Sequence, residues 1–194
     1  MDNSIRVIDD FLDEKEIDVV EKELTEGSGL FEWFYFPSTV ANDNEFSLGL
    51  DSPQLVHSFY SITKRQTAQM SPKFKLIECL LEKLEKHDIK NVMLIRAKAN
   101  VLFPTNKNLK HSVPHIDLPY VKHYYNLLYY VNDTDGDTYF FNEDKTIREQ
   151  ISPKRNRAVY FDGDILHASS NPKKHDSRVV INLNLGDKDK CKNG

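Results

Sequence analysis

The chain has 194 residues, 39% of them hydrophobic and 29% charged, and its formal net charge is −4. These values predict one soluble globular domain, and they disfavour nucleic acid or an anionic membrane surface as a partner. Two cysteines are too few for a disulfide framework, and no apolar stretch is long enough for a signal peptide or a membrane-spanning helix. We therefore expect a cytoplasmic protein.

The first 90 residues carry short strand signals and two amphipathic helix signals. Residues 5–8, IRVI, predict a strand, and a capping pair that begins at Asp13 predicts a helix to about residue 24. The aromatic run at 31–36, FEWFYF, predicts a strand whose rings lie in the core. A Ser-Pro start and apolar side chains at helical spacing predict a helix over 72–87 that packs one face on a sheet.

From residue 91 onward the hydrophobic period changes from helical to two, which is typical of strands. The predicted strands are 91–103, 124–132, 138–142, 157–162 and 178–185. The acidic sequence DTDGD between the second and third of them predicts a hairpin turn, because it lacks the further ligands of a calcium loop. Helices followed by an all-β region predict a mainly β, α+β fold, a barrel or sandwich with the helices packed outside.

The first of these predicted strands alternates apolar and polar side chains. Ile95 and Ala97 belong to its core face, whereas Arg96, Lys98 and Asn100 belong to the opposite face. That polar face either meets solvent or lines a polar pocket.

The sequence HSVPHIDLPY, residues 111–120, holds a candidate metal site. If the chain is extended there, as Pro114 favours, His115 and Asp117 point to the same side. A third ligand must come from elsewhere, and the best candidate is His167 after the strand at 157–162. Two histidines and one carboxylate, with other coordination positions open, suit a non-haem Fe(II) oxygenase.

Arg178 and Tyr130 strengthen this interpretation. Arg178 stands at the start of the last predicted strand, where it can reach back beside the metal and bind a carboxylate with two hydrogen bonds. Tyr130, near the end of the strand after the ligand pair, could donate its hydroxyl to the same carboxylate. A keto acid that chelates iron at one end needs such a clamp at its other end.

These residues lie in the segments HID, YYNLLYYVNDTDGDTYFF and PKRNRAVYFDGDILHASSNPKKHDSR. Residues 91–186 thereby resemble the catalytic half of the 2-oxoglutarate- and Fe(II)-dependent oxygenases of the prolyl 4-hydroxylase type, especially small stand-alone forms of bacteria and phages. The opening segment IRVIDDFLDEKEIDVVEKEL resembles the first strand and helix of that family. The resemblance implies a double-stranded β-helix, a jelly-roll fold with the iron between two sheets.

The resemblance maps the metal ligands onto His115, Asp117 and His167 and the cosubstrate arginine onto Arg178. It maps the assisting tyrosine onto Tyr130, although Tyr129 is adjacent. One domain would then span residues 1–186, with supporting elements over 1–90 and the β-helix core over 91–186, before a flexible charged tail at 187–194.

The resemblance also implies that Lys98, Asn100 and Asn182 line the pocket beside the cosubstrate, with Arg96 and Asn184 turned to the same side. The cofactors would be Fe(II), 2-oxoglutarate and O₂, with ascorbate as an optional reductant.

Two turns depart from the family pattern. Asp135-Gly136 replaces the usual Gly-Gly pair, and Asn156 replaces a common glycine. Asp and Asn tolerate unusual backbone dihedrals, so neither change threatens the iron site. The loop at 104–114 is longer than in many relatives, and it lies near the substrate entrance in the family.

The implied function is hydroxylation of a C–H bond with release of succinate and CO₂. The substrate is open between a prolyl or other peptide and an amino acid or small metabolite, and so is the oligomeric state. Two alternatives remain at this point: a catalytically silent β-helix that binds a ligand or partner, and a zinc hydrolase that uses the same triad.

Overall fold

The computed structural model describes residues 4–26, 29, 31–39, 52–62, 67–107 and 109–190. Its helical elements are α1 (Glu14–Glu21), the π-helical η1 (Lys22–Glu26), the 3₁₀ turn η3 (Phe74–Ile77), α2 (Glu78–Glu82) and the 3₁₀ turn η4 (Glu85–His87). Its strands are β1 (Ile5–Ile8), β2 (Phe34–Phe36), β3 (Gln54–Ile62), β4 (Ala68–Met70), β5 (Val92–Leu102), β6 (Tyr124–Tyr130), β7 (Thr138–Phe141), β8 (Ile147–Ile151), β9 (Arg157–Asp162), β10 (His167–Ser169) and β11 (Arg178–Asp187). Among the described residues, none of these helices has the length and apolar character needed to cross a membrane.

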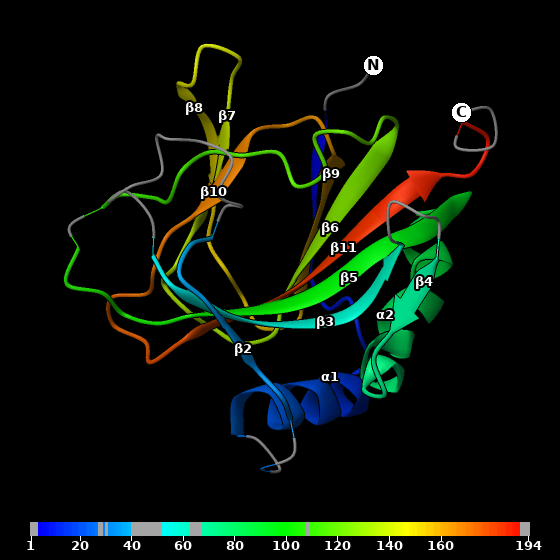
Figure 1. The fold of residues 1–194 in the computed structure, drawn as a ribbon, viewed down its shortest axis with the longest axis horizontal. Coiled ribbons are helices and arrows are strands. Elements are labelled where there is room, and N and C mark those ends of the chain that lie inside the picture. The colour runs from blue at the N-terminus through cyan, green and yellow to red at the C-terminus, as the bar shows by residue number, and fades with distance from the viewer. Residues whose placement is uncertain are drawn as a thin grey trace.

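The strands form two antiparallel sheets (Figure 1). The larger sheet has the order β1-β9-β6-β11-β5-β3-β2, with β4 added to β3, and the smaller sheet has the order β10-β7-β8. Side chains from both sheets line one cavity. The predicted mainly β fold, a double-stranded β-helix, is therefore confirmed.

The helices pack on the outer face of the larger sheet (Figure 1). The core between them joins α1 and α2 to β5 and β11 through Ile17, Val20, Leu80, Ala97, Ala99, Ile181 and Leu183. The residues that face this core are odd-numbered along β11 and, from Ala97 onward, along β5, so Lys98, Asn100, Asn182 and Asn184 point to the opposite face, toward the smaller sheet. The capping box at Asp13 that starts α1 is present as predicted.

The predicted helix over 72–87 is wrong as a single helix. It is divided into η3, α2 and η4. The buried positions Ile77, Leu80 and Leu84 still lie on one face, as the helical spacing predicts.

The prediction that the aromatic run at 31–36 lies in the core is only half right. Phe31 and Trp33 pack against the core. Phe34, Tyr35 and Phe36 are exposed, because β2 is a three-residue strand at the edge of the larger sheet.

The sequence DTDGD does not form the predicted hairpin. It connects β6 to β7, and these strands lie in different sheets. The connection therefore carries the chain from the larger sheet to the smaller one, where it places the turn next to Arg178.

The strands β3, β4, β8 and β10 lie outside the strands predicted from the sequence. In the predicted tail, β11 continues to Asp187, and Lys188 donates its backbone N–H to the carbonyl of Asn91 at 2.9 Å. Residues 191–194 of that tail lie outside the described residues.

Candidate metal centre

His115 and His167 face each other across a short antiparallel bridge. The backbone N–H of His115 donates to the carbonyl of His167 at 3.0 Å, and the N–H of His167 donates to the carbonyl of His115 at 3.1 Å. Directly opposed residues of an antiparallel pair turn their side chains to the same side, and the two ring centroids are 4.8 Å apart. Ser112 continues this pairing by donating its N–H to Ser169 at 2.7 Å, so the segment before Asp117 is held along β10.

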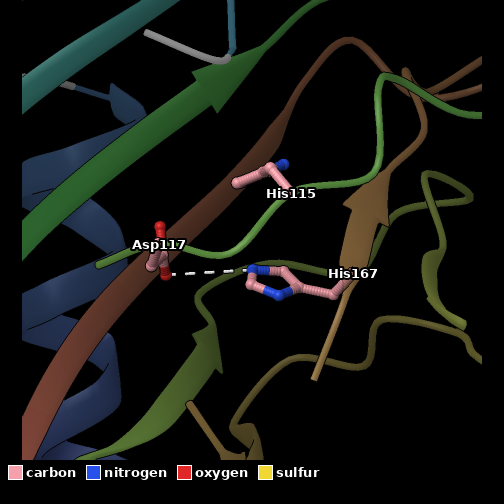
Figure 2. Close-up of side chains that lie close together, drawn as sticks. All are labelled: His115, Asp117 and His167. Carbon is pink, nitrogen blue, oxygen red and sulfur yellow. Dashed lines mark ion pairs between the residues drawn. The ribbon is translucent and has the colours of Figure 1, made fainter. Parts of the chain in front are cut away.

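Asp117 completes a group of three candidate ligands (Figure 2). One nitrogen or oxygen atom from each of His115, Asp117 and His167 lies within 4.8 Å of the other two. The carboxylate oxygen Oδ2 of Asp117 is 3.8 Å from Nε2 of His167. Two imidazole nitrogens and one carboxylate oxygen are a donor set that suits Fe(II) and leaves other coordination positions open.

Both histidines are oriented by backbone carbonyls. Nδ1 of His115 lies 3.1 Å from the carbonyl oxygen of Val113, and Nδ1 of His167 lies 3.1 Å from that of Ile165. A neutral imidazole that donates from Nδ1 keeps the lone pair of Nε2 free for a metal. Burial and the nearby His115 lower the pKa of His167 to about 4, so this ring is neutral at pH 7, as a metal ligand must be.

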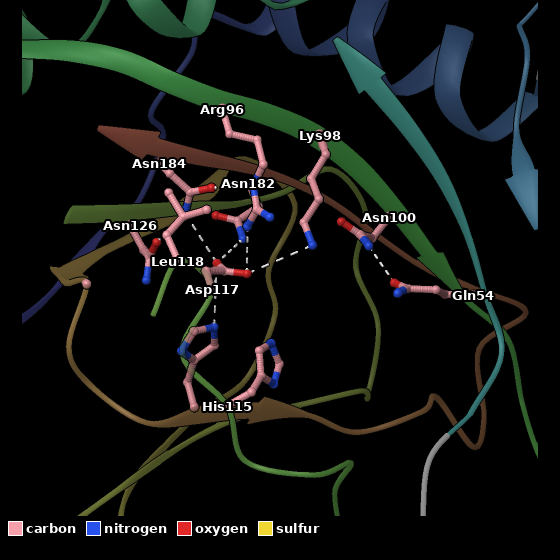
Figure 3. Close-up of polar contacts among 12 residues, drawn as sticks. Gln54, Arg96, Lys98, Asn100, His115, Asp117, Leu118, Asn126, Asn182 and Asn184 are labelled. Atoms are coloured by element: carbon pink, nitrogen blue, oxygen red, sulfur yellow. Dashed lines mark hydrogen bonds and ion pairs between the residues drawn. The ribbon is translucent and has the colours of Figure 1, made fainter. Parts of the chain in front are cut away.

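Asp117 is surrounded by hydrogen-bond donors and cations (Figure 3). Arg96 Nη2 donates to Oδ1 at 2.9 Å, and Lys98 Nζ is 3.9 Å from the same oxygen. Nδ2 of Asn182 and of Asn184 donate to Oδ2. Burial alone would raise the pKa of Asp117, but Lys98 and Arg96 hold this pKa well below its usual value, so the carboxylate is ionised.

Arg178 lines the same cavity as His115, Asp117 and His167, at its other end. Its side chain is buried, Nε donates to the carbonyl of Gly136 at 2.7 Å, and Nη2 donates to Oγ1 of Thr138 at 2.8 Å. Among the described residues, no carboxylate lies within 4 Å of this guanidinium. A buried cation without an acidic partner suits a site that receives a carboxylate from a ligand.

Tyr130 is not among the residues that line the cavity, and its predicted hydrogen bond to the cosubstrate stays a prediction. Its hydroxyl donates to Oγ1 of Thr138 at 2.7 Å, and its ring lies under the guanidinium of Arg178, 5.6 Å from centroid to Cζ. Thr138 stands between Tyr130 and the cavity, and it is one of the lining residues. Because Oγ1 accepts from both Tyr130 and Arg178, the hydroxyl hydrogen of Thr138 is free to be donated to a ligand. Tyr129 points away, since its hydroxyl donates to Asn156.

The other predicted pocket residues, Lys98, Asn100 and Asn182, all line the same cavity. Burial lowers the pKa of Lys98 to about 8, against the opposing effect of Asp117. Sequence reasoning missed Gln54, whose Oε1 accepts a hydrogen bond from Asn100. No strand signal marked Gln54, because β3 lacks a clear alternation. Thr138 was also missed, although a polar residue at the start of a predicted strand could have indicated it.

The two departures from the family turns have different effects. Asn156 has a φ of 66°, and its side chain bonds the backbone N–H and carbonyl of Leu12, which fixes the N-terminal segment on the core. The prediction that this asparagine tolerates an unusual dihedral is confirmed. Gly136 packs so closely on Arg178 that an added Cβ would lie 2.8 Å from Cδ of the arginine.

Comparison with known proteins agrees with this geometry. The family model of the 2OG-Fe(II) oxygenase superfamily matches residues 106–186, a stretch that holds His115, Asp117, His167 and Arg178. No curated protein sequence matches the chain.

Three solved structures illustrate the likeness of fold. A prolyl hydroxylase from Trichoplax adhaerens, in complex with a hypoxia-inducible factor peptide fragment, is 16% identical with a TM-score of 0.62, covering 100% of this chain and 88% of that one. A prolyl-4-hydroxylase from Pseudomonas putida is 13% identical with a TM-score of 0.56, covering 95% and 93%. The epimerase SnoN from nogalamycin biosynthesis is 12% identical with a TM-score of 0.62, covering 95% and 79%.

At these identities the structures show a common fold and no common substrate. The family match covers the part of the chain in which the sequence predicts the metal ligands. The family match confirms the predicted resemblance of this chain to the 2OG-Fe(II) oxygenase superfamily, and the prolyl hydroxylase structures show that their fold is shared.

Proposed function

We propose that this chain is a 2-oxoglutarate- and Fe(II)-dependent dioxygenase. It inserts one oxygen atom of O₂ into a C–H bond of a prolyl, peptidyl or amino-acid substrate, and 2-oxoglutarate is converted to succinate and CO₂. The observation that carries the proposal is one cavity with His115, Asp117 and His167 at one end and Arg178 at the other, where the described residues give this arginine no acidic partner.

The residues of the chain have distinct tasks in this reaction. His115, Asp117 and His167 would hold Fe(II), which supplies O₂ activation and oxidative decarboxylation of the keto acid when bound. Arg178 binds the far carboxylate of 2-oxoglutarate, and Thr138 donates its hydroxyl hydrogen to the same group. Leu128 and Val180 line the cavity between these ends and limit the access of water.

Arg96, Asn182 and Asn184 position the carboxylate of Asp117. Their hydrogen bonds fix both oxygens, and the positive charge of Arg96 keeps the group ionised. The presence of a carboxylate at this position disfavours halogenation, because a halide would need that coordination position.

A catalytically silent binding module is not favoured, since the complete set of ligands and Arg178 is brought together. A zinc hydrolase could use the same three ligands, so the choice of metal requires an experiment. Under anaerobic conditions, addition of 2-oxoglutarate to the Fe(II)-loaded protein should produce a weak visible charge-transfer band, and O₂ should then yield succinate.

The variant Asp117→Ala should lose both signals. The control is Asp135→Ala, which removes an exposed carboxylate that bonds the 173–175 loop and should leave both signals intact. Hydrolytic activity with Zn(II) alone, without succinate formation under Fe(II), would contradict the proposal.

A further inference from the structure

The inward side chains of the larger sheet form rows that cross neighbouring strands (Figure 3). Residues directly opposite each other in antiparallel strands lie on the same face. Along β11, Arg178 is opposite Leu102, Asn182 is opposite Lys98, and Asn184 is opposite Arg96. We call the last row, formed by Ser61, Arg96, Asn184 and Asn126 on β3, β5, β11 and β6, the Arg96 row.

The candidate metal centre lies between Arg178 and the Arg96 row. Asp117 accepts a hydrogen bond from Asn182 and lies near Lys98. Asn182 and Lys98 therefore mark the position of the candidate metal site along the strands. Along β11, Arg178 lies four residues before Asn182, and Asn184 lies two residues after it. A strand rises about 3.3 Å per residue, so the backbone of the Arg96 row is roughly 7 Å beyond that of Asn182, and the Arg96 side chain reaches back to Asp117. A cosubstrate that extends from the metal to Arg178 therefore leaves the Arg96 row free for another molecule.

Arg96 has an incompletely matched charge. Nε donates to Oδ1 of Asn184 at 2.7 Å and Nη2 to Asp117 at 2.9 Å, and the described residues provide no acceptor for Nη1. Asp117 is its only acidic contact in the described part of the chain, and this carboxylate also faces Lys98 and the proposed metal. The Arg96 side chain is 24% exposed, so a ligand can approach it from solvent.

Two buried polar atoms beside Arg96 lack partners among the described residues. They are the donor Nδ2 of Asn126 and the acceptor Oδ1 of Asn182. Unsatisfied buried polar atoms are costly, and they occur where a ligand or an ordered water satisfies them. A guanidinium, an amide donor and an amide acceptor are together suited to a carboxylate that has an ammonium or hydroxyl group nearby.

We propose that the substrate is a small molecule whose carboxylate binds Arg96 within about 7 Å of the hydroxylated carbon. A free amino acid or hydroxy acid has this chemistry, whereas an internal prolyl residue of a peptide is neutral. The inference rests on the proposed function, because the proposed metal site defines where hydroxylation occurs. It selects the amino-acid class from the substrates left open above.

The first test measures binding without turnover. With Mn(II) and 2-oxoglutarate bound, dissociation constants are compared for free L-amino acids, including L-proline and L-glutamate, and for their carboxamides. The best acid should bind about 10- to 100-fold more tightly than its amide, as expected for a charge-assisted hydrogen bond. End-blocked peptides containing proline or aspartate form the third arm and should bind no better than the amides.

The second test changes the charge of the row without touching a metal ligand. Ser61 lies opposite Arg96 on the same face, so Ser61→Glu places a competing carboxylate beside the guanidinium. It should raise the KM for the acid substrate about tenfold and leave the KM for the keto-acid cosubstrate unchanged. Ser61→Gln is the matched neutral control and should change neither value.

The outcomes separate this inference from the proposed function. The inference is overturned if acids and amides bind equally, or if an end-blocked peptide binds more tightly. It is also overturned if Ser61→Glu and Ser61→Gln have equal effects, and each of these results holds even if succinate forms. Preference for acids over amides supports it, and this readout does not depend on turnover. If the Fe(II)-loaded protein forms no succinate from 2-oxoglutarate and O₂ in the absence of another substrate, that result would instead count against the dioxygenase proposal.

Discussion

Gly136→Ala should weaken 2-oxoglutarate binding through Arg178. The φ of Gly136 is not in the left-handed region, so the backbone accepts alanine, and the effect is steric. The new Cβ would lie 2.7 Å from the carbonyl oxygen of Ser170 and 2.8 Å from Cδ of Arg178. The Ser170 backbone is held by a 2.8 Å hydrogen bond to Asp137, so the arginine side chain must move.

The size of the effect follows from these contacts. Overpacking of this kind costs about 1–3 kcal/mol of unfolding free energy. Displacement of the guanidinium removes charge-assisted hydrogen bonds worth about 1.5–3 kcal/mol, which corresponds to a 10- to 100-fold rise in the dissociation constant for 2-oxoglutarate.

Calorimetric titration of 2-oxoglutarate into the Mn(II)-loaded variant measures the binding effect, and urea denaturation measures stability. Asp135→Ala, in the same turn but without a contact to Arg178, is the control and should bind normally. If Gly136→Ala lowers stability but binds 2-oxoglutarate like the unchanged protein, the steric reasoning about Arg178 is refuted.

Three further predictions concern the core, the cavity and the surface. Asn156→Ala should lower the unfolding free energy in urea by about 2–4 kcal/mol, because it removes buried hydrogen bonds to the N-terminal segment and places alanine at a φ of 66°. Thr138→Val should weaken calorimetric binding of 2-oxoglutarate more than Tyr130→Phe does, because only Thr138 lines the cavity, and equal effects would show that the lining is misassigned. Asp9 has its pKa lowered by Arg157, so the pair stabilises the fold above pH 3.8 and this contribution is lost as the pH falls through the lowered pKa. In Asp9→Asn, the unfolding free energy should therefore fall less on acidification, by at most about 1 kcal/mol, since the pair is accessible to solvent. Urea denaturation at several pH values below 5 measures this difference.

The fold could be predicted from residue 91 onward because strand alternation is a local signal. The predicted strand 157–162 matches β9 residue for residue. In the N-terminal half, the structure depends on contacts that the local pattern does not contain. β3 is placed by pairing with β5, and the aromatic residues of β2 are exposed because β2 is the edge strand of the larger sheet.

The alternation in β5 also fails at one point for a physical reason. Ile95 was expected on the core face, but Leu94 and Val92 pack against the core instead. The pairing of β5 with β11 shifts between Asn184 and Leu185, where a β-bulge changes which residues face the helices. A sequence pattern cannot show a bulge of this kind, because the extra residue is set by the partner strand.

In the candidate site too, the features that depend on local spacing could be predicted, and those that depend on contacts distant in sequence could not. The arrangement of His115 and Asp117 follows from their spacing of two, and the sequence therefore indicated it. The insertion of Thr138 between Tyr130 and the cavity depends on β7 lying in the opposite sheet, which no spacing along the chain expresses. The contact between Arg96 and Asp117 likewise joins β5 to a loop, so it emerges only from the folded chain.

The two β-bulges of the larger sheet distinguish the surroundings of the Arg96 row from those of Arg178. One lies in β3, where Phe59 is the extra residue between Ser58 and Tyr60, and the other lies in β5, where Ile95 is the extra residue opposite the step from Asn184 to Leu185. Both flank the Arg96 row. Bulges bend a strand and increase its twist, which opens a sheet locally. The regular pairing around Arg178 instead encloses that side chain, which is 3% exposed. The enclosed Arg178 suits a cosubstrate of constant shape, whereas the partly exposed side chain of Arg96 suits contact with the molecule to be hydroxylated.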